Sequence, residues 1–271
     1  MKEKMSPQEK MDELQGYLKE LGRVLLAFSG GVDSSFLLTV LHQSQVETLA
    51  VTGRSATMPE WDRQSVEEVV KLFDLPHRYI DSGEMADADF VKNPVNRCFY
   101  CKNNLFGRLQ ELAQKEGYDV VVDGSTADDL NDYRPGLLAR NQHQVFSPLM
   151  AVGLTKDEVR SLSRAAGLPT WNRAASPCLS SRVTYGDPIE ERSLRMIEAA
   201  EHWLHGLGFS EVRVRKQGET ARVELPVSDF PQFLTGELRQ KTVTFFLELG
   251  FRFVSLDLEG FQSGRLNRLV L

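Results

Sequence analysis

Hydrophobic residues in the first part of the chain follow two patterns, helical spacing and short continuous runs. A helix is predicted near the N-terminus, with Ser6-Pro7 as its N-cap and first residue, because apolar residues recur there every three or four positions: Met11, Leu14, Leu18 and Leu21. The run from Leu25 to Phe28 is short and uninterrupted, which is typical of a buried strand. A second apolar helix follows after a Ser-Gly-Gly turn.

Strand and helix patterns then alternate. Strands are predicted at Val46 to Val51, His77 to Asp81 and Val120 to Val122. Helices are predicted from about Pro59 to Phe73, from Cys98 through Leu112, and from Thr155 to Gly167. This alternation predicts an α/β fold with a doubly wound parallel sheet, in which ligands bind at the carboxyl ends of the strands.

The C-terminal part of the chain has a different pattern, and Tyr185-Gly186-Asp187-Pro188 marks the expected boundary. We predict one domain over residues 1–185 and a small α+β domain over residues 186–271. In the second domain, strands at 212–215 and 221–225 alternate like a hairpin that turns at Gln217-Gly218. Helices are predicted from Pro188 to Leu207 and from Asp229 to Leu249, and a last strand from Arg252 to Leu258.

The segment Ser29-Gly30-Gly31-Val32-Asp33-Ser34 joins the first buried strand to the second helix. Glycines let the backbone approach a ligand closely, and amides at a helix N-terminus bind anions. Asp33 would oppose a bare phosphate unless it holds a divalent cation such as Mg²⁺. The segment is neither a Walker A loop nor a Gly-x-Gly-x-x-Gly loop. The plain alternative is an ordinary turn in which Asp33 interacts with the helix dipole.

A polar loop follows the strand that ends near Val122. Its polar residues are Asp123, Asp128, Asp129, Asn131, Asp132 and Arg134. Acidic loops are most often only solvated. Because this one comes at the ligand-facing edge of the sheet, we favour contact with a bound ligand, a metal or a substrate, with Arg134 as the hydrogen-bond donor to a phosphate.

The three cysteines are too few for a secreted disulfide framework. Cys98 and Cys101 form a Cys-x-x-Cys pair at a helix start, and Cys178 lies far downstream. A redox pair would not need Cys178, and structural zinc would need a fourth ligand. An iron-sulfur cluster on three thiolates uses every cysteine, and we favour it over these readings and over separate buried thiols.

Arginine and serine side chains gather around the start of the C-terminal domain. Arg213 and Arg215 share one face of a strand, and Ser181-Arg182 lies in the loop before it. Such arginines are more often solvated than functional, yet here they suit a phosphate clamp. Glu224 and Asp229 are weaker candidates for a metal site.

Composition narrows the class of protein. With 271 residues, 41% of them hydrophobic, the chain can bury a normal core. The net charge of −6 gives no global positive field, so no nucleic acid is expected as a partner. The sequence shows neither a signal peptide nor an apolar run long enough to span a membrane, and we therefore expect a cytoplasmic protein.

The residues Ser29 to Ser34 resemble the PP-loop of the ATP pyrophosphatase superfamily. Over nearly the whole chain, the sequence is similar to the ATP-dependent sulfur transferases of nickel-pincer nucleotide cofactor synthesis, the LarE family. The resemblance rests on the PP-loop together with these further segments: Asp123-Gly124, residues 131–137, Ser180-Ser181-Arg182, residues 212–215 and residues 256–261.

The resemblance implies a reaction. ATP adenylylates a carboxylate of a pyridinium biscarboxylic acid mononucleotide, sulfur displaces AMP, and two rounds give the bis-thiocarboxylate. It also implies roles for residues: the PP-loop residues Ser29, Gly30, Gly31 and Ser34 would bind ATP with Arg54, Asp123, Gly124 and Arg134, while Asp33 would hold Mg²⁺. Ser181, Arg182, Arg213 and Arg215 would hold the substrate phosphate.

One branch of the family donates the sulfur of a single cysteine. This sequence looks like the other branch, in which three cysteines, here Cys98, Cys101 and Cys178, hold a 4Fe-4S cluster that carries sulfide. A homo-oligomer, for example a hexamer, is also implied. The alternatives are a tRNA thiolase of the same superfamily, a sacrificial donor that uses Cys178, and a nucleotide-binding sensor whose Cys-x-x-Cys binds zinc.

Overall fold

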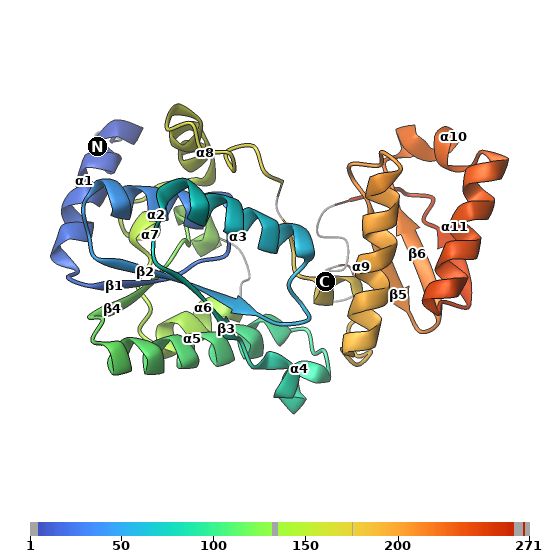
Figure 1. Ribbon diagram of the computed structural model, residues 1–271, viewed down its shortest axis with the longest axis horizontal. Coiled ribbons are helices and arrows are strands. Elements are labelled where there is room, and N and C mark those ends of the chain that lie inside the picture. The colour runs from blue at the N-terminus through green and yellow to red at the C-terminus, as the bar shows by residue number, and fades with distance from the viewer. Residues whose placement is uncertain (1–4, 132–134, 175, 263–267, 269–271) are drawn as a thin grey trace. The chain divides into compact units, whose positions relative to one another are not determined.

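The computed structural model describes residues 5–131, 135–174, 176–262 and 268. The chain forms two compact units (Figure 1). The first consists of Met1–Glu84 and Cys98–Ser176, and the second of Met85–Arg97 and Pro177–Leu271. The second unit therefore takes in a short segment from the middle of the sequence. The domain boundary after residue 185, expected from the sequence, remains a prediction.

The first unit is built on a parallel sheet of four strands. They are β1 (Val24–Ala27), β2 (Thr48–Arg54), β3 (His77–Asp81) and β4 (Val120–Asp123), in the spatial order β3-β2-β1-β4. The predicted α/β class with a parallel sheet is confirmed. The strand order reverses between β1 and β4, and in doubly wound sheets ligands bind at such a reversal, outside the carboxyl ends of the strands.

Helices cover both faces of this sheet (Figure 1). Ser6 is the N-cap of the first helix, as predicted, and it forms a capping box with Glu9; Thr155 and Glu158 form a second capping box. The helices of the first unit are α1 (Pro7–Glu20), α2 (Val32–Gln43), α3 (Glu60–Phe73), α5 (Arg97–Glu116), α6 (Pro135–Gln142), α7 (Pro148–Ala151) and α8 (Lys156–Ala165), with the 3-10 turn Ala127–Asn131. The 3-10 turn Glu84–Ala86 lies where the chain passes from the first unit to the second.

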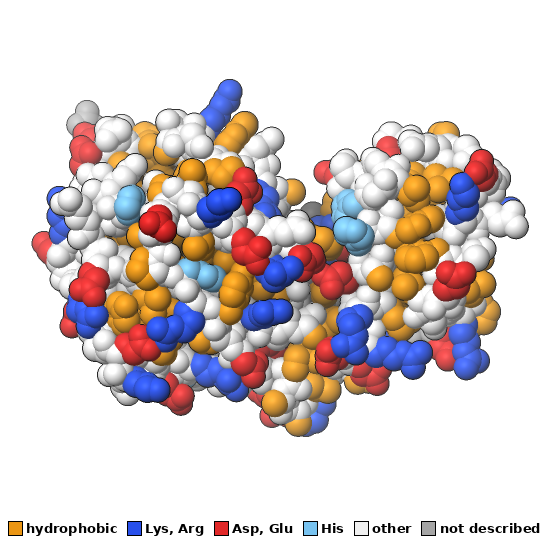
Figure 2. Space-filling view, in the orientation of Figure 1, with side chains coloured by type: hydrophobic (Ala, Val, Ile, Leu, Met, Phe, Trp, Pro, Cys, Tyr) orange, Lys and Arg blue, Asp and Glu red, His pale blue; other side chains and the backbone are white. Residues whose placement is uncertain are grey.

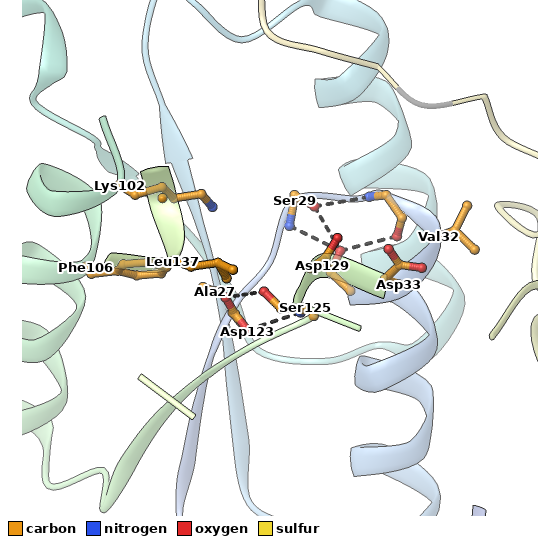
Figure 3. A pocket seen from close by; sticks show the side chains of 14 residues that line it. Ala27, Ser29, Val32, Asp33, Lys102, Phe106, Asp123, Ser125, Asp129 and Leu137 are labelled. Carbon is orange, nitrogen blue, oxygen red and sulfur yellow. Dashed lines mark hydrogen bonds between the residues drawn. The ribbon is translucent and has the colours of Figure 1, made fainter. Parts of the chain in front are cut away.

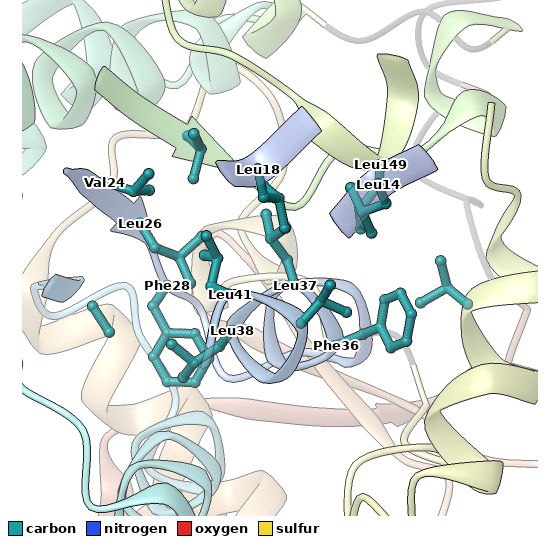
Figure 4. Packing of buried hydrophobic residues seen from close by; sticks show 14 of the residues in the cluster. Leu14, Leu18, Val24, Leu26, Phe28, Phe36, Leu37, Leu38, Leu41 and Leu149 are labelled. Carbon is teal, nitrogen blue, oxygen red and sulfur yellow. The ribbon is translucent and has the colours of Figure 1, made fainter. Parts of the chain in front are cut away.

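Alternate residues of β1 enter two different cores. Val24 and Leu26 join a cluster with α1 and α2 on one face, which Figure 4 shows around Leu37 and Leu38. Leu25 points to the other face, where it packs with residues of α5 such as Phe106 and Leu109. Burial on both faces explains the uninterrupted apolar run, because neither side of the strand meets water. β1 ends at Ala27, and after Phe28 comes the segment Ser29 to Ser34, called the phosphate loop below.

The second unit holds a three-stranded sheet of order β5-β6-β7. β5 (Arg213–Gln217) and β6 (Thr220–Glu224) form the predicted antiparallel hairpin, and β7 (Phe253–Leu256) pairs parallel to β6. The remaining elements are α4 (Ala88–Val91), α9 (Glu191–Gly206), α10 (Phe230–Phe233), α11 (Gly236–Leu249) and the 3-10 turns Leu179–Arg182 and Val227–Asp229.

One predicted helix is wrong. The segment from Asp229 to Leu249 is not continuous, because α10 ends at Phe233 and α11 begins only at Gly236. Thr235 stands between them as the N-cap of α11 with extended backbone angles. Threonine followed by glycine favours such a break, since the first suits an N-cap and the second is a poor helix former.

The surface in Figure 2 mixes basic and acidic side chains on the face that it shows, with neither sign gathered into a large field. Among the residues that the structure describes, no helix combines the length and the apolar character that a membrane span requires.

Candidate functional site

The phosphate loop is shaped by close contact with α3. Gly30 has a φ of +71°, and a Cβ atom there would lie 2.7 Å from Val66 Cγ2 and 2.9 Å from the Val66 backbone nitrogen. Only glycine meets both demands without strain. Gly31 is the N-cap of α2 and carries no side chain, so the first amides of the helix face the loop. Such amides are suited to bind phosphate.

The loop after β4 lies directly against the phosphate loop. A Cβ atom on Gly124 would lie 2.8 Å from the backbone nitrogen of Ser34. Asp123 is buried and accepts hydrogen bonds from Ser125 Oγ at 2.9 Å and Ser147 Oγ at 2.6 Å. Two of the predicted ATP residues, Asp123 and Gly124, are thus brought to the phosphate loop by the order of the strands.

A pocket of about 270 Å³ opens at this place (Figure 3). Phosphate-loop residues Ser29, Gly31, Asp33 and Ser34 line it together with Asp123 and Gly124. That these residues bind a ligand remains a prediction. Asp129 of the predicted polar loop also lines the pocket. The sequence interpretation had given no individual role to the other lining residues Lys102, Phe106, Ser125, Gly136 and Leu137. The mixture of an apolar wall with carboxylates is suited to a nucleoside and a metal-bound phosphate.

A second pocket of about 220 Å³ shares the phosphate loop and Asp33 but is basic. Its cations are Lys156 and Arg160 from α8 and Arg173 from the segment after it. Lys156 Nζ lies 3.0 Å from Asp129 Oδ1, and Arg173 donates to Asp62 Oδ1 at 2.8 Å. The interpretation of the sequence missed this group. The sequence feature that could have revealed this group is the four-residue spacing of Lys156 and Arg160, which places two cations on one face of a helix.

Two other predicted ATP residues lie elsewhere or outside the described chain. Arg54 is exposed at the end of β2, where its guanidinium carbon lies 5.9 Å from the ring centre of Tyr79. Of the described residues that line the two pockets, none is Arg54. Arg134 falls in the segment 132–134, outside the described residues.

The three cysteines are divided between the units. Cys98 and Cys101 lie at the start of α5 in the first unit, three residues apart and so on neighbouring positions of one helix face. Cys98 is exposed and Cys101 is partly buried. Cys178 belongs to the second unit, where it is the N-cap of the turn Leu179–Arg182. Over the described ranges, no group of three or more candidate ligands that could hold a metal ion is found.

The four predicted phosphate-clamp residues do come together, inside the second unit. Arg182 is fully buried, forms an ion pair with Glu201 at 3.0 Å and donates to Ser181 Oγ at 2.9 Å. Arg215 donates to the Ser181 carbonyl at 2.9 Å and pairs with Glu224 at 2.6 Å. Arg182 also donates to the carbonyls of Pro177 and Cys178, so it fixes the backbone that carries Cys178.

Arg213 differs from its two neighbours. It donates to the Val212 carbonyl and lies 5.3 Å from the ring centre of Phe261, but it forms no ion pair with a described carboxylate. Burial, and next the positive charge of Arg182, hold the pKa of Arg213 below its usual value. An anion placed beside Arg213 would stabilise its charged form and so offset both causes of the lowered pKa. Arg213 is therefore the member of the group best suited to contact a phosphate directly.

The two weaker metal candidates have other contacts. Glu224 is buried, and its Oε1 accepts from both Arg215 and Arg222. Asp229 accepts from Ser228 Oγ at 3.1 Å in the turn before α10. A metal role for either residue remains a prediction.

Comparison with known proteins now adds to this geometry. No family model matches the chain. An uncharacterized protein of Synechocystis is 39% identical over 262 residues, which cover 96% of this chain and 98% of the relative. The pyridinium-3,5-bisthiocarboxylic acid mononucleotide synthase of Lactiplantibacillus plantarum is 36% identical over 255 residues, covering 92% of this chain and 91% of that protein.

The chain belongs to the family of this synthase. A tRNA-specific 2-thiouridylase of Syntrophus aciditrophicus is a more distant relative, 28% identical over 74% of this chain and 69% of its own length. The resemblance to the LarE family is therefore confirmed, and so is the wider PP-loop class. Membership makes the chain an ATP-dependent sulfurtransferase, as the sequence predicted.

Proposed function

We propose that the chain adenylylates the carboxylates of pyridinium-3,5-biscarboxylic acid mononucleotide with ATP and converts them to thiocarboxylates for nickel-pincer nucleotide synthesis. The observation that carries this proposal is the pair of pockets that share the phosphate loop. One combines an apolar wall with carboxylates, and the other gathers three cations. This division suits an ATP whose α-phosphate lies at the loop and whose pyrophosphate leaves on the basic side.

The first step joins a substrate carboxylate oxygen to the α-phosphorus and breaks the bond to the β-phosphate oxygen, which leaves with the electron pair as pyrophosphate. The amides of residues 29–34 and the hydroxyl of Ser34 bind the phosphates. Asp33, with Asp123 and Asp129 in the same pocket, is of the donor type that holds Mg²⁺. Lys156, Arg160 and Arg173 offset charge on the departing pyrophosphate.

The second step forms a carbon-sulfur bond at the activated carbonyl and releases AMP with the electrons of the broken carbon-oxygen bond. Cys98, Cys101 and Cys178 are thiolate donors of the kind that bind iron, and a 4Fe-4S cluster on them would supply sulfide repeatedly. Arg213 contacts the substrate phosphate directly, and Ser181, Arg182 and Arg215 help to hold this phosphate in place. A homo-oligomer and a cytoplasmic location remain predictions.

The test is a reaction with anaerobically purified protein. Pyrophosphate and AMP are measured with ATP, sulfide and the biscarboxylic acid mononucleotide, and the thiocarboxylate is followed by mass spectrometry. We expect pyrophosphate release that depends on the mononucleotide and about four irons per chain, lost in Cys98→Ala. Absence of mononucleotide-dependent pyrophosphate would refute the substrate. Zinc without sulfide, or no metal at all, would refute the cluster and favour Cys178 as a single-use donor.

A tRNA thiolase is the second candidate, because 2-thiouridylases are among the relatives. The net charge of −6 argues against it. A salt-sensitive shift of tRNA in a gel, together with tRNA-dependent pyrophosphate release, would favour this candidate instead.

A further inference from the structure

Lys102 points its amino group into the pocket that opens beside the phosphate loop (Figure 3). Its Nζ lies 5.2 Å from the ring centre of Phe106, one turn further along α5. Its Cγ would lie 3.1 Å from a Cβ atom built on Gly136. The stem of the lysine is therefore held between a ring and a backbone, and its direction into the pocket is fixed by packing.

The charge of Lys102 stands out in this pocket. Three carboxylates line the pocket, those of Asp33, Asp123 and Asp129, and among the described lining residues Lys102 is the one cation. Asp123 accepts from serine hydroxyls and Asp129 pairs with Lys156. Lys102 forms no ion pair with any carboxylate that the structure describes. Its ammonium is thus available to an anion that enters the pocket.

The anion that suits this place is the α-phosphate. The cations Lys156, Arg160 and Arg173 line the second pocket, whereas Lys102 lines only the first. The two groups are therefore matched to different phosphates of one nucleotide, with the phosphate loop common to both.

We propose that Lys102 is a catalytic residue whose ammonium contacts a non-bridging oxygen of the α-phosphate. This inference rests on the proposed function. When the carboxylate attacks and pyrophosphate departs, Lys102 neutralises the charge that builds up on the α-phosphate oxygens. It does so again when sulfur attacks the acyl carbon and AMP leaves. No proton is transferred from Lys102 in either step.

The place of Lys102 on α5 links this role to sulfur transfer. Cys98 precedes Lys102 by four residues, so the two share one face of the helix. The Cys98 carbonyl oxygen would lie 3.8 Å from the same built Cβ atom of Gly136. The helix that presents the cation to the nucleotide thus also carries the first thiol, one turn before Lys102.

The experiment compares Lys102→Ala and Lys102→Arg with wild type, and Lys115→Ala serves as a matched control because it removes an exposed lysine from the same helix. Binding of AMP and of adenosine is measured by calorimetry, and pyrophosphate release is measured with substrate. In Lys102→Ala we expect about tenfold weaker AMP binding, unchanged adenosine binding and roughly 100-fold slower pyrophosphate release. Lys102→Arg should recover most of the AMP affinity.

Two outcomes would overturn the inference while the proposed function stands. One is wild-type AMP affinity and wild-type pyrophosphate release in Lys102→Ala. The other is an equal loss of AMP and adenosine binding, which would mean that Lys102 only shapes the pocket. If wild type itself releases no pyrophosphate, the proposed function fails, and the comparison of AMP with adenosine still decides whether Lys102 contacts a phosphate.

Discussion

Two regions of this molecule are suited to bind phosphate, and they are built in opposite ways. In the first unit, the phosphate loop supplies backbone amides at the start of α2, and the surrounding side chains line a pocket. In the second unit the positive charge belongs to side chains. Arg182 forms a buried ion pair with Glu201, and Arg215 forms one with Glu224. Where the backbone supplies the donors, side chains can change without unfolding the site. Where buried side chains supply the charge, binding and stability depend on the same residues.

The largest effect on stability is expected from Arg182→Ala. This change leaves Glu201 charged and fully buried without its partner, which should lower the free energy of unfolding by about 3–5 kcal/mol. Urea denaturation measures it. The double variant Arg182→Met with Glu201→Leu should recover most of the loss, because no lone charge is then buried. A single variant as stable as wild type would show that Glu201 finds another partner.

The matching change in the first unit is Asp33→Asn, and it should act on catalysis instead. Pyrophosphate release should fall between about 10²-fold and 10³-fold, since in the proposed function this carboxylate holds Mg²⁺. The melting temperature should stay close to that of wild type, because Asp33 is only partly buried. Asp157→Asn is the control, as it removes an exposed carboxylate from α8. Equal losses in both variants would contradict a metal role for Asp33.

Arg213→Ala separates the two functions within the arginine group. Because Arg213 has no described carboxylate partner, we expect little change in urea denaturation. The KM for the mononucleotide should rise roughly tenfold with kcat nearly unchanged, as befits a binding contact made equally in ground state and transition state. A large loss of stability would mean that Arg213 is structural like its neighbours.

The smallest effect concerns pH. His77 Nε2 lies 2.9 Å from Thr52 Oγ1, which itself donates to the carbonyl of Phe28, the residue before the phosphate loop. Burial lowers the pKa of His77. Below the ordinary value of about 6.5 the unfolded chain therefore binds more protons, and stability falls as the pH drops from there through the folded pKa. His77→Gln should make the free energy of unfolding less dependent on pH in this range. An unchanged slope would exclude His77 as its source.

The sequence predicted what depends on local pattern. The continuous apolar run of β1 and the glycines after it were enough to place the parallel sheet and the phosphate loop. The break before Gly236 was missed because helical periodicity continues across it. Arg160 was missed although its spacing from Lys156 was visible in the sequence. Lys102 and Arg173 were missed for another reason: they line the pockets from separate elements, and no spacing in the sequence records that.

The arginines show the same limit. The sequence grouped Arg182, Arg213 and Arg215 correctly, yet it could not distinguish them. Their difference depends on Glu201 and Glu224, which pair with two of the three and come from other elements.

Gly30 and Gly124 have a consequence for how such a protein can vary over generations. Each fills a place where a single added methyl group would lie within 3 Å of backbone atoms of a neighbouring segment. Neither carries a functional group, yet replacing either by alanine would move the phosphate-binding amides. In a library of random variants, we therefore expect these two positions to be among the least tolerant in the chain. The lack of room for a side chain at these two positions would then restrict substitutions as strongly as the need for charged residues does.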